Sequence, residues 1–94
     1  MKPRLVEQAV KWLNTVEELT SAEERPEYEE VRSLSDDGYA LVRKLRARAR
    51  HLEKLSKGRG KYADIFREEA RRLAGFADEV EDAIGTLWDA LRRR

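Results

Sequence analysis

The sequence predicts an all-α protein: an up-and-down antiparallel bundle of three or four helices in a single domain spanning residues 1–94. Apolar residues recur at alternating spacings of three and four along most of the chain, which is the period of one helical face. A proline at position 26 and glycines at positions 58 and 60 interrupt this pattern. These interruptions divide the chain into helical segments joined by short turns.

The first helix is expected at about residues 4–20. Pro3 precedes it at a position that tolerates proline. The connection that follows contains the capping-box pattern Ser21-x-x-Glu24 and then Pro26, so the chain is expected to turn there. The apolar face of this helix consists of Leu5, Ala9, Trp12, Val16 and Leu19.

The second helical segment covers residues 26–57 and has a candidate break or kink at 35–38. Ser35 could cap a new helix whose first turn holds two aspartates, which the helix dipole favours. Gly38, however, keeps the apolar stripe in phase, as one continuous helix would. Both alternatives stay open. The stripe consists of Tyr28, Val31, Leu34, Gly38, Leu41, Val42, Leu45, Ala49, Leu52 and Leu55.

The third helix is expected at residues 61–92, after the turn SKGRGK, whose two glycines can end a helix and reverse the chain. Gly75 and Gly85 fall off its stripe, where each costs about 1 kcal/mol relative to alanine. The stripe itself alternates four and three without a slip and consists of Phe66, Ala70, Leu73, Ala77, Val80, Ile84, Leu87 and Leu91.

The predicted helices differ in length. The two long segments would each extend about 48 Å, whereas the first helix reaches only about 25 Å. One short helix cannot cover a long hairpin, so either the long segment folds back or a second copy covers the glycine-turn end. This mismatch predicts self-association as a homodimer, or docking on another helical protein surface, through Leu52, Leu55, Ile65 and Phe66.

Charge is segregated along a chain whose 20 basic and 19 acidic residues nearly cancel. Residues 17–37 hold nine acidic and two basic residues, while residues 43–61 hold nine basic and one acidic residue. A nonspecific nucleic-acid site is therefore a hypothesis for the basic block. Its residues would be Arg43, Arg46, Arg50, Lys54, Lys57 and Arg59. The block lacks aromatic platforms beyond Tyr62 and amides for reading bases, so a solvated helix flank is the preferred interpretation.

Glu69 is the one acidic residue in the middle of the third apolar stripe. If residue i of the hairpin faces roughly residue 118 minus i, Ala49 lies opposite and leaves room for a long side chain. We therefore expect Glu69 to form a partly buried ion pair with Arg46 or Arg50 that sets the hairpin register.

Catalytic chemistry has no support in the sequence. The chain contains no cysteine and a single histidine, His51, which lies off the apolar stripe, so neither a metal site nor a nucleophile–histidine pair is expected. No cofactor motif is present: GRGK lacks the first glycine and the hydroxyl residue of a phosphate-binding loop. The aromatic residues Trp12, Trp88, Tyr28, Phe66 and Phe76 could line a small-molecule pocket, but they are spaced as core residues.

Targeting signals are also not evident. The first residues have no apolar signal region, and the longest uncharged stretch, residues 83–88, is far shorter than a membrane span. No membrane partner is expected, and a cytoplasmic location fits these features without being specified by them.

In style, the chain resembles de novo designed helical bundles. Heptad-like stripes run through nearly all of its 94 residues, it has a compact glycine turn and caps, and it has no cysteine and one methionine. The resemblance implies a structural scaffold without chemistry. Gly75, Gly85 and the clustered arginines depart from idealised designs, so a small natural interaction module is the alternative. The expected role is a non-enzymatic scaffold or a helix-mediated interaction module.

Overall fold

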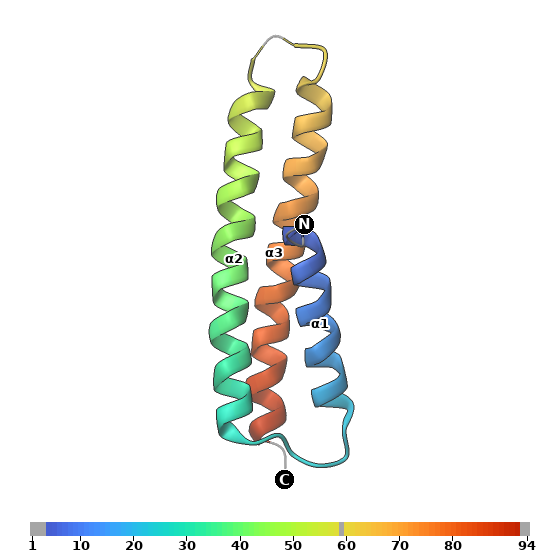
Figure 1. Ribbon diagram of the computed structural model, residues 1–94, viewed down its shortest axis with the longest axis vertical. Coiled ribbons are helices and arrows are strands. Elements are labelled where there is room, and N and C mark those ends of the chain that lie inside the picture. The colour runs from blue at the N-terminus through green and yellow to red at the C-terminus, as the bar shows by residue number, and fades with distance from the viewer. Residues whose placement is uncertain (1–3, 59, 93–94) are drawn as a thin grey trace.

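The computed structural model describes residues 4–58 and 60–92, and these residues form three helices and no strand (Figure 1). The helices are α1, Leu5–Ser21; α2, Tyr28–Ser56; and α3, Ala63–Arg92. The all-α class is confirmed, and each observed end lies within two residues of its predicted position. The helices pack on one another in a way that is compatible with a bundle.

The connection between α1 and α2 is capped differently from the expectation. Ser21 is the last residue of α1, and its hydroxyl donates to the carbonyl of Glu17 at 2.6 Å, so it does not begin a new helix. The capping box lies six residues later, where Glu27 accepts from the third backbone N–H of α2 and Glu30 accepts from the N–H of Glu27 at 3.4 Å. Pro26, immediately before this cap, is buried.

The candidate break at 35–38 is not present, because α2 is continuous from Tyr28 to Ser56. Ser35 is buried and accepts a hydrogen bond from the indole of Trp88 at 3.2 Å, so it does not cap a helix. Gly38 has a packing role: a β-carbon there would lie 2.5 Å from Cζ2 of Trp12 and 3.0 Å from Ile84. The glycine therefore provides the space in which the Trp12 ring packs against α2.

The Trp12 indole also anchors α1 by hydrogen bonding. Its Nε1 donates to the backbone carbonyl of Leu34 at 2.8 Å, an oxygen on α2. Trp88 completes the junction from α3, with Tyr28 packed edge-on at 5.9 Å between ring centroids. Side chains from all three helices thus meet near this end of the molecule, and Ala9, Val31 and Leu87 there are fully buried.

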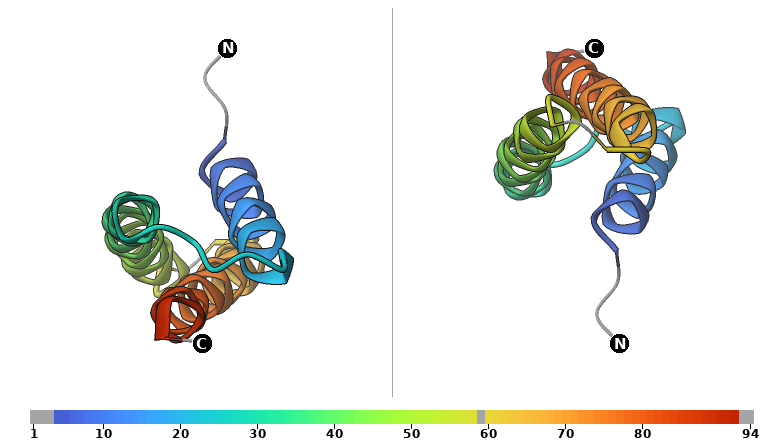
Figure 2. Two further views of the ribbon diagram at one scale, coloured as in Figure 1. Left: turned by 90° about the horizontal axis from the view of Figure 1, so that it is seen from below. Right: turned by 90° about the horizontal axis from the view of Figure 1, so that it is seen from above.

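The molecule is elongated. Its extents are 55 × 27 × 18 Å and its radius of gyration is 15.8 Å, against about 12 Å for a compact domain of this length. The cause is visible in Figure 1, where α1 lies beside only the lower half of the α2–α3 hairpin. Views along the long axis show the three helices arranged in a triangle (Figure 2). We call the part covered by α1 the proximal part, and the part from Arg48 to Leu73, which includes the turn, the distal part.

The turn between α2 and α3 does not use the expected backbone conformation. No glycine with a positive φ is found in the described part of the chain, so Gly58 does not adopt the left-handed form. Its N–H instead bonds to the carbonyl of Leu55 at 3.2 Å, which closes the last turn of α2. Further along, α3 passes through Gly75 and Gly85 as a continuous helix, and a β-carbon at either position would meet no atom within 4 Å.

Candidate functional site

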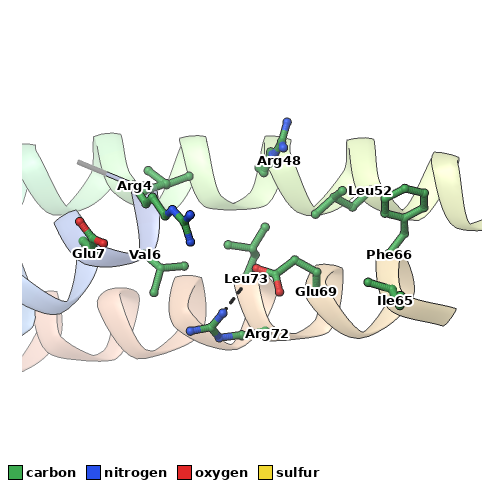
Figure 3. A pocket seen from close by; sticks show the side chains of 11 residues that line it. Arg4, Val6, Glu7, Arg48, Leu52, Ile65, Phe66, Glu69, Arg72 and Leu73 are labelled. Carbon is green, nitrogen blue, oxygen red and sulfur yellow. Dashed lines mark ion pairs between the residues drawn. The ribbon is translucent and has the colours of Figure 1, made fainter. Parts of the chain in front are cut away.

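A hollow on the described surface lies where α1 begins and the hairpin is left uncovered. This cavity has a volume of about 600 Å³, and we call it the distal groove (Figure 3). Its apolar lining comes from all three helices and consists of Leu5, Val6, Leu52, Ile65, Phe66 and Leu73. It lies on the distal part because α1, at 17 residues, is shorter than α2 and α3, at 29 and 30 residues.

Three of the four residues predicted for self-association, Leu52, Ile65 and Phe66, line this groove, and all four differ in exposure. Ile65 is 59% exposed and Leu55 is 44% exposed, so both present apolar surface to water. Phe66 is half-buried, and Leu52 is buried between the helices at 7% exposure. Leu55 follows Leu52 by three residues on α2 and does not line the groove. The prediction of an uncovered apolar surface at this end therefore describes Ile65 and Leu55 best.

Charged side chains form the rim of the distal groove. Arg4 directly precedes α1, Glu7 belongs to its first turn, Arg48 comes from α2, and Glu69 and Arg72 come from α3. Figure 3 shows the dashed ion pair between Arg72 and Glu69, whose atoms lie 3.6 Å apart. Within residues 4–58 and 60–92, neither Arg4 nor Arg48 forms an ion pair. The rim thus combines one neutralised pair with two unpaired guanidinium groups and one carboxylate.

The expected register ion pair is not the one that forms. Glu69 pairs with Arg72 on its own helix, while Arg46 lies 3.2 Å from Glu81 and 3.5 Å from Asp78, and Arg50 forms no ion pair with a described residue. The assumed register was off by about one helical turn, since Gly38 lies against Ile84 where it placed residue 80. The Arg46 side chain therefore reaches acids much farther along α3 than Glu69.

The hydrogen bond from Arg46 to Glu81, followed by the attraction of that carboxylate, raises the pKa of the Arg46 guanidinium. An arginine is protonated at any ordinary pH with or without this shift. The protonation of Arg46 therefore does not make the free energy of unfolding depend on pH in that range. Both side chains are partly exposed, at 42% for Arg46 and 52% for Glu81, so solvent screens the interaction.

The basic stretch of α2 is divided between two sides of the helix. At 3.6 residues per turn, Arg48 and Arg50 point roughly 200° apart. Arg48 borders the groove, whereas Arg46 reaches the acids on the opposite side of α3. Of the residues proposed for polyanion binding, Arg43, Arg50, Lys54 and Lys57 are exposed, Arg46 is neutralised, and Arg59 lies outside the described residues. None of the described residues in this predicted set lines the distal groove.

The described residues offer little to other kinds of chemistry. No cluster of three or more histidine, cysteine or carboxylate side chains is placed to hold a metal ion in residues 4–58 and 60–92, and His51 is exposed. In these ranges every buried side-chain nitrogen and oxygen has a hydrogen-bond partner, so no polar group points unpaired into a cavity. Trp12 and Trp88 pack into the three-helix junction, while Phe66 belongs to the groove. None of the described helices is both long and apolar enough to cross a lipid bilayer.

Comparison of the chain with protein-family models, with curated proteins and with solved structures gave no match. The geometry of the distal groove is therefore the basis for any assignment of function.

Four rim residues were not singled out as site residues from the sequence: Arg4, Glu7, Arg48 and Arg72. The sequence contained a signal for Arg4 and Glu7, because the length mismatch places the beginning of α1 partway along the hairpin. Residues there then border whatever the short helix leaves open. Arg48 lies on the groove side of α2, whereas Arg46 pairs with Glu81 away from the groove.

Proposed function

We propose that this protein is a helix-docking module: an up-and-down bundle that acts as a rigid scaffold and uses the distal groove to receive one further helix, from a partner protein or from a second copy. The observation that carries the proposal is the side chain of Ile65, which is 59% exposed and lines a cavity of about 600 Å³ together with other apolar residues of all three helices. Apolar surface that is left open in this way marks interaction sites.

The proximal part of the same hairpin supports this role. There α1 packs on α2 and α3 and buries Ala9, Trp12 and Val16 to 6% exposure or less. The distal part offers the same two helices without the third. An amphipathic helix placed end to end with α1 would extend the three-helix packing toward the turn, which is the helix-in-groove mode of recognition.

The length of the open surface sets the size of the docked helix. From Arg48 to Ser56, α2 provides nine residues, or about 13 Å. A docked segment therefore contacts the groove through two to three turns, with anchors three and four positions apart. Since a free helix this short is marginal in water, the occupant is expected to belong to a longer folded element or to become helical on binding.

Calorimetric titration with a cross-linked helical peptide tests the proposal. The peptide has about 14 residues, with leucines at spacings of three and four and glutamine at the other positions. We expect saturable binding that Ile65→Gln weakens at least about fivefold, the loss of one apolar anchor. The matched control is Val10→Gln, because Val10 is 39% exposed on α1 and does not line the groove.

Measurement of the solution mass by sedimentation completes the test, because self-association would occupy the same surface. A chain that is monomeric at every concentration and binds no helical peptide of any charge would overturn the proposed function.

Polyanion binding is the second candidate. It is favoured by the exposed cations Arg43, Arg50, Lys54 and Lys57, which form no ion pair within the described ranges. It predicts retention on a heparin column that falls steeply with salt and is lost when Arg46 and Arg50 are replaced by glutamate. Elution of the intact protein at low salt would exclude it.

A further inference from the structure

We propose that the helix received by the distal groove is acidic: an amphipathic segment of another protein that places leucine-like anchors on the apolar lining and carboxylates against Arg4 and Arg48. This inference rests on the proposed helix-docking function and names the chemistry of its partner. It is carried by the juxtaposition of an apolar floor with a rim whose two unpaired guanidinium groups come from different segments.

The rim provides the local part of the argument. Arg72 and Glu69 neutralise one another at 3.6 Å, so the groups left to meet a partner are Arg4, Arg48 and Glu7. Arg4, directly before α1, and Arg48 of α2 both border the groove (Figure 3), so a helix docked along it has a guanidinium group on the side of each segment. Each guanidinium can hold a carboxylate with two parallel hydrogen bonds, which makes a glutamate-bearing helix the matching surface.

The wider charge distribution acts in the same direction. The distal part, residues 48–73, carries nine basic and four acidic residues, so its net charge is +5. The acidic residues 17–37 belong mainly to the other end, around the α1–α2 connection. A positive field at the groove speeds the approach of an acidic segment and opposes a basic one.

A second copy of this chain fits the groove less well. Docking of one distal part on another would bring two regions of the same high positive charge together. The helix that a copy could offer in their place, α1, already has its apolar face buried against its own hairpin, with Ala9, Trp12 and Val16 inside. Freeing that helix would require opening the three-helix junction. The charge and the packing both favour a different, acidic partner.

The experiment compares three cross-linked helical peptides of identical apolar face. Their outward positions carry glutamate, glutamine or lysine, and binding to the full chain is measured by calorimetry at low and high salt. We expect the glutamate peptide to bind about tenfold more tightly than the glutamine peptide at low salt, and the lysine peptide to bind most weakly. The preference should shrink to about twofold or less near 1 M salt, where screening acts within a few ångströms.

Two charge reversals locate the effect. Arg48→Glu should remove most of the preference for the glutamate peptide while leaving the affinity of the glutamine peptide within about twofold. Arg50→Glu is the control, because it makes the same change in net charge on the opposite side of α2 and should leave more than half of the preference in place. Circular dichroism establishes that both variants are as helical as the parent chain.

The outcomes separate the two proposals. Equal affinity for the three peptides would overturn the acidic-partner inference and leave helix docking in place, while no binding of any peptide would remove both. A dimer in sedimentation at low salt would assign the groove to a second copy and contradict the inference. An equal loss of preference in Arg48→Glu and Arg50→Glu would attribute the effect to net charge and overturn the role of the rim. Competition between single-stranded DNA and the glutamate peptide would assign the surface to a polyanion and contradict the inference.

Discussion

The proximal and distal parts of this molecule are built from the same two helices but differ in what covers them. In the proximal part, α1 completes the packing, and Leu87, Val31 and Val80 are fully buried. In the distal part the same hairpin is open on one side, and Ile65 and Leu55 face water. The difference teaches that burial and exposure are separated in space: the covered end contains the packed three-helix junction, and the uncovered end leaves apolar side chains in water, on the surface that we propose for helix docking.

Truncation of one leucine in each part gives the largest expected contrast. Leu87→Ala removes a fully buried side chain at the three-helix junction and should lower the free energy of unfolding by about 2–5 kcal/mol. Leu55→Ala removes a side chain that is 44% exposed and should cost about 1 kcal/mol or less. Urea denaturation followed by circular dichroism measures both. Similar costs at the two sites would show that the two parts are equally well packed.

Gly38→Ala tests the contact that fixes α1 to α2. Helix propensity alone would make this change stabilising by about 1 kcal/mol. The new β-carbon would lie 2.5 Å from the Trp12 ring, however, so we expect a net destabilisation of about 1–3 kcal/mol from overpacking.

The same substitution in a Trp12→Leu background is the control for that prediction. Without the indole the alanine has room, so its cost should largely disappear in the double variant, and the difference measures the coupling of the two sites. A stabilising Gly38→Ala in the parent chain would contradict the described packing of Trp12.

Glycines away from this junction should respond with the opposite sign. Gly75 and Gly85 lie in the interior of α3, and an added β-carbon meets no atom within 4 Å at either position. Gly75→Ala and Gly85→Ala should each raise the free energy of unfolding by about 0.5–1 kcal/mol through helix propensity. Because the sites are ten residues apart, the double variant should show the sum. A loss of stability at either site would indicate a contact that the structure lacks.

The smallest effect is expected at the surface ion pairs. Arg46→Ala removes the contacts to Glu81 and Asp78, which are largely exposed. We therefore expect it to lower the free energy of unfolding by less than Gly75→Ala raises it. A double-mutant cycle with Glu81→Ala should give a coupling that decreases as salt increases. A coupling that does not respond to salt would mean that the pair is shielded from solvent.

The helices were predictable because burial repeats along the chain. Each stripe is a local property, and the observed ends of α1, α2 and α3 lie within two residues of the predicted ones. The uncovered groove was predictable as well, since it follows from the lengths of the segments alone. Two buried polar residues were missed, Ser35 and Ser56, although both fall in phase with the stripe of α2 and both hydroxyls make hydrogen bonds.

Features that depend on how helices meet were not predictable from one chain. The expected Glu69 pair assumed a straight hairpin with a fixed register, and Arg46 in fact contacts Asp78 and Glu81. Gly38 and Ser35 together suggest a helix break when read locally, whereas the structure uses them to admit Trp12 and to bond Trp88. In each case the deciding contact comes from a residue more than twenty positions away, which a local pattern does not contain.

Both tryptophans of the chain lie in the proximal part, with their indole nitrogens donating to Leu34 and Ser35 of α2. Intrinsic ultraviolet emission therefore monitors the attachment of α1 and is insensitive to the far end of the hairpin. A ligand that fills the groove and leaves the emission maximum unchanged has bound to a preformed surface. A red shift on binding would reveal that occupancy there loosens the other end, which would make the two ends mechanically linked.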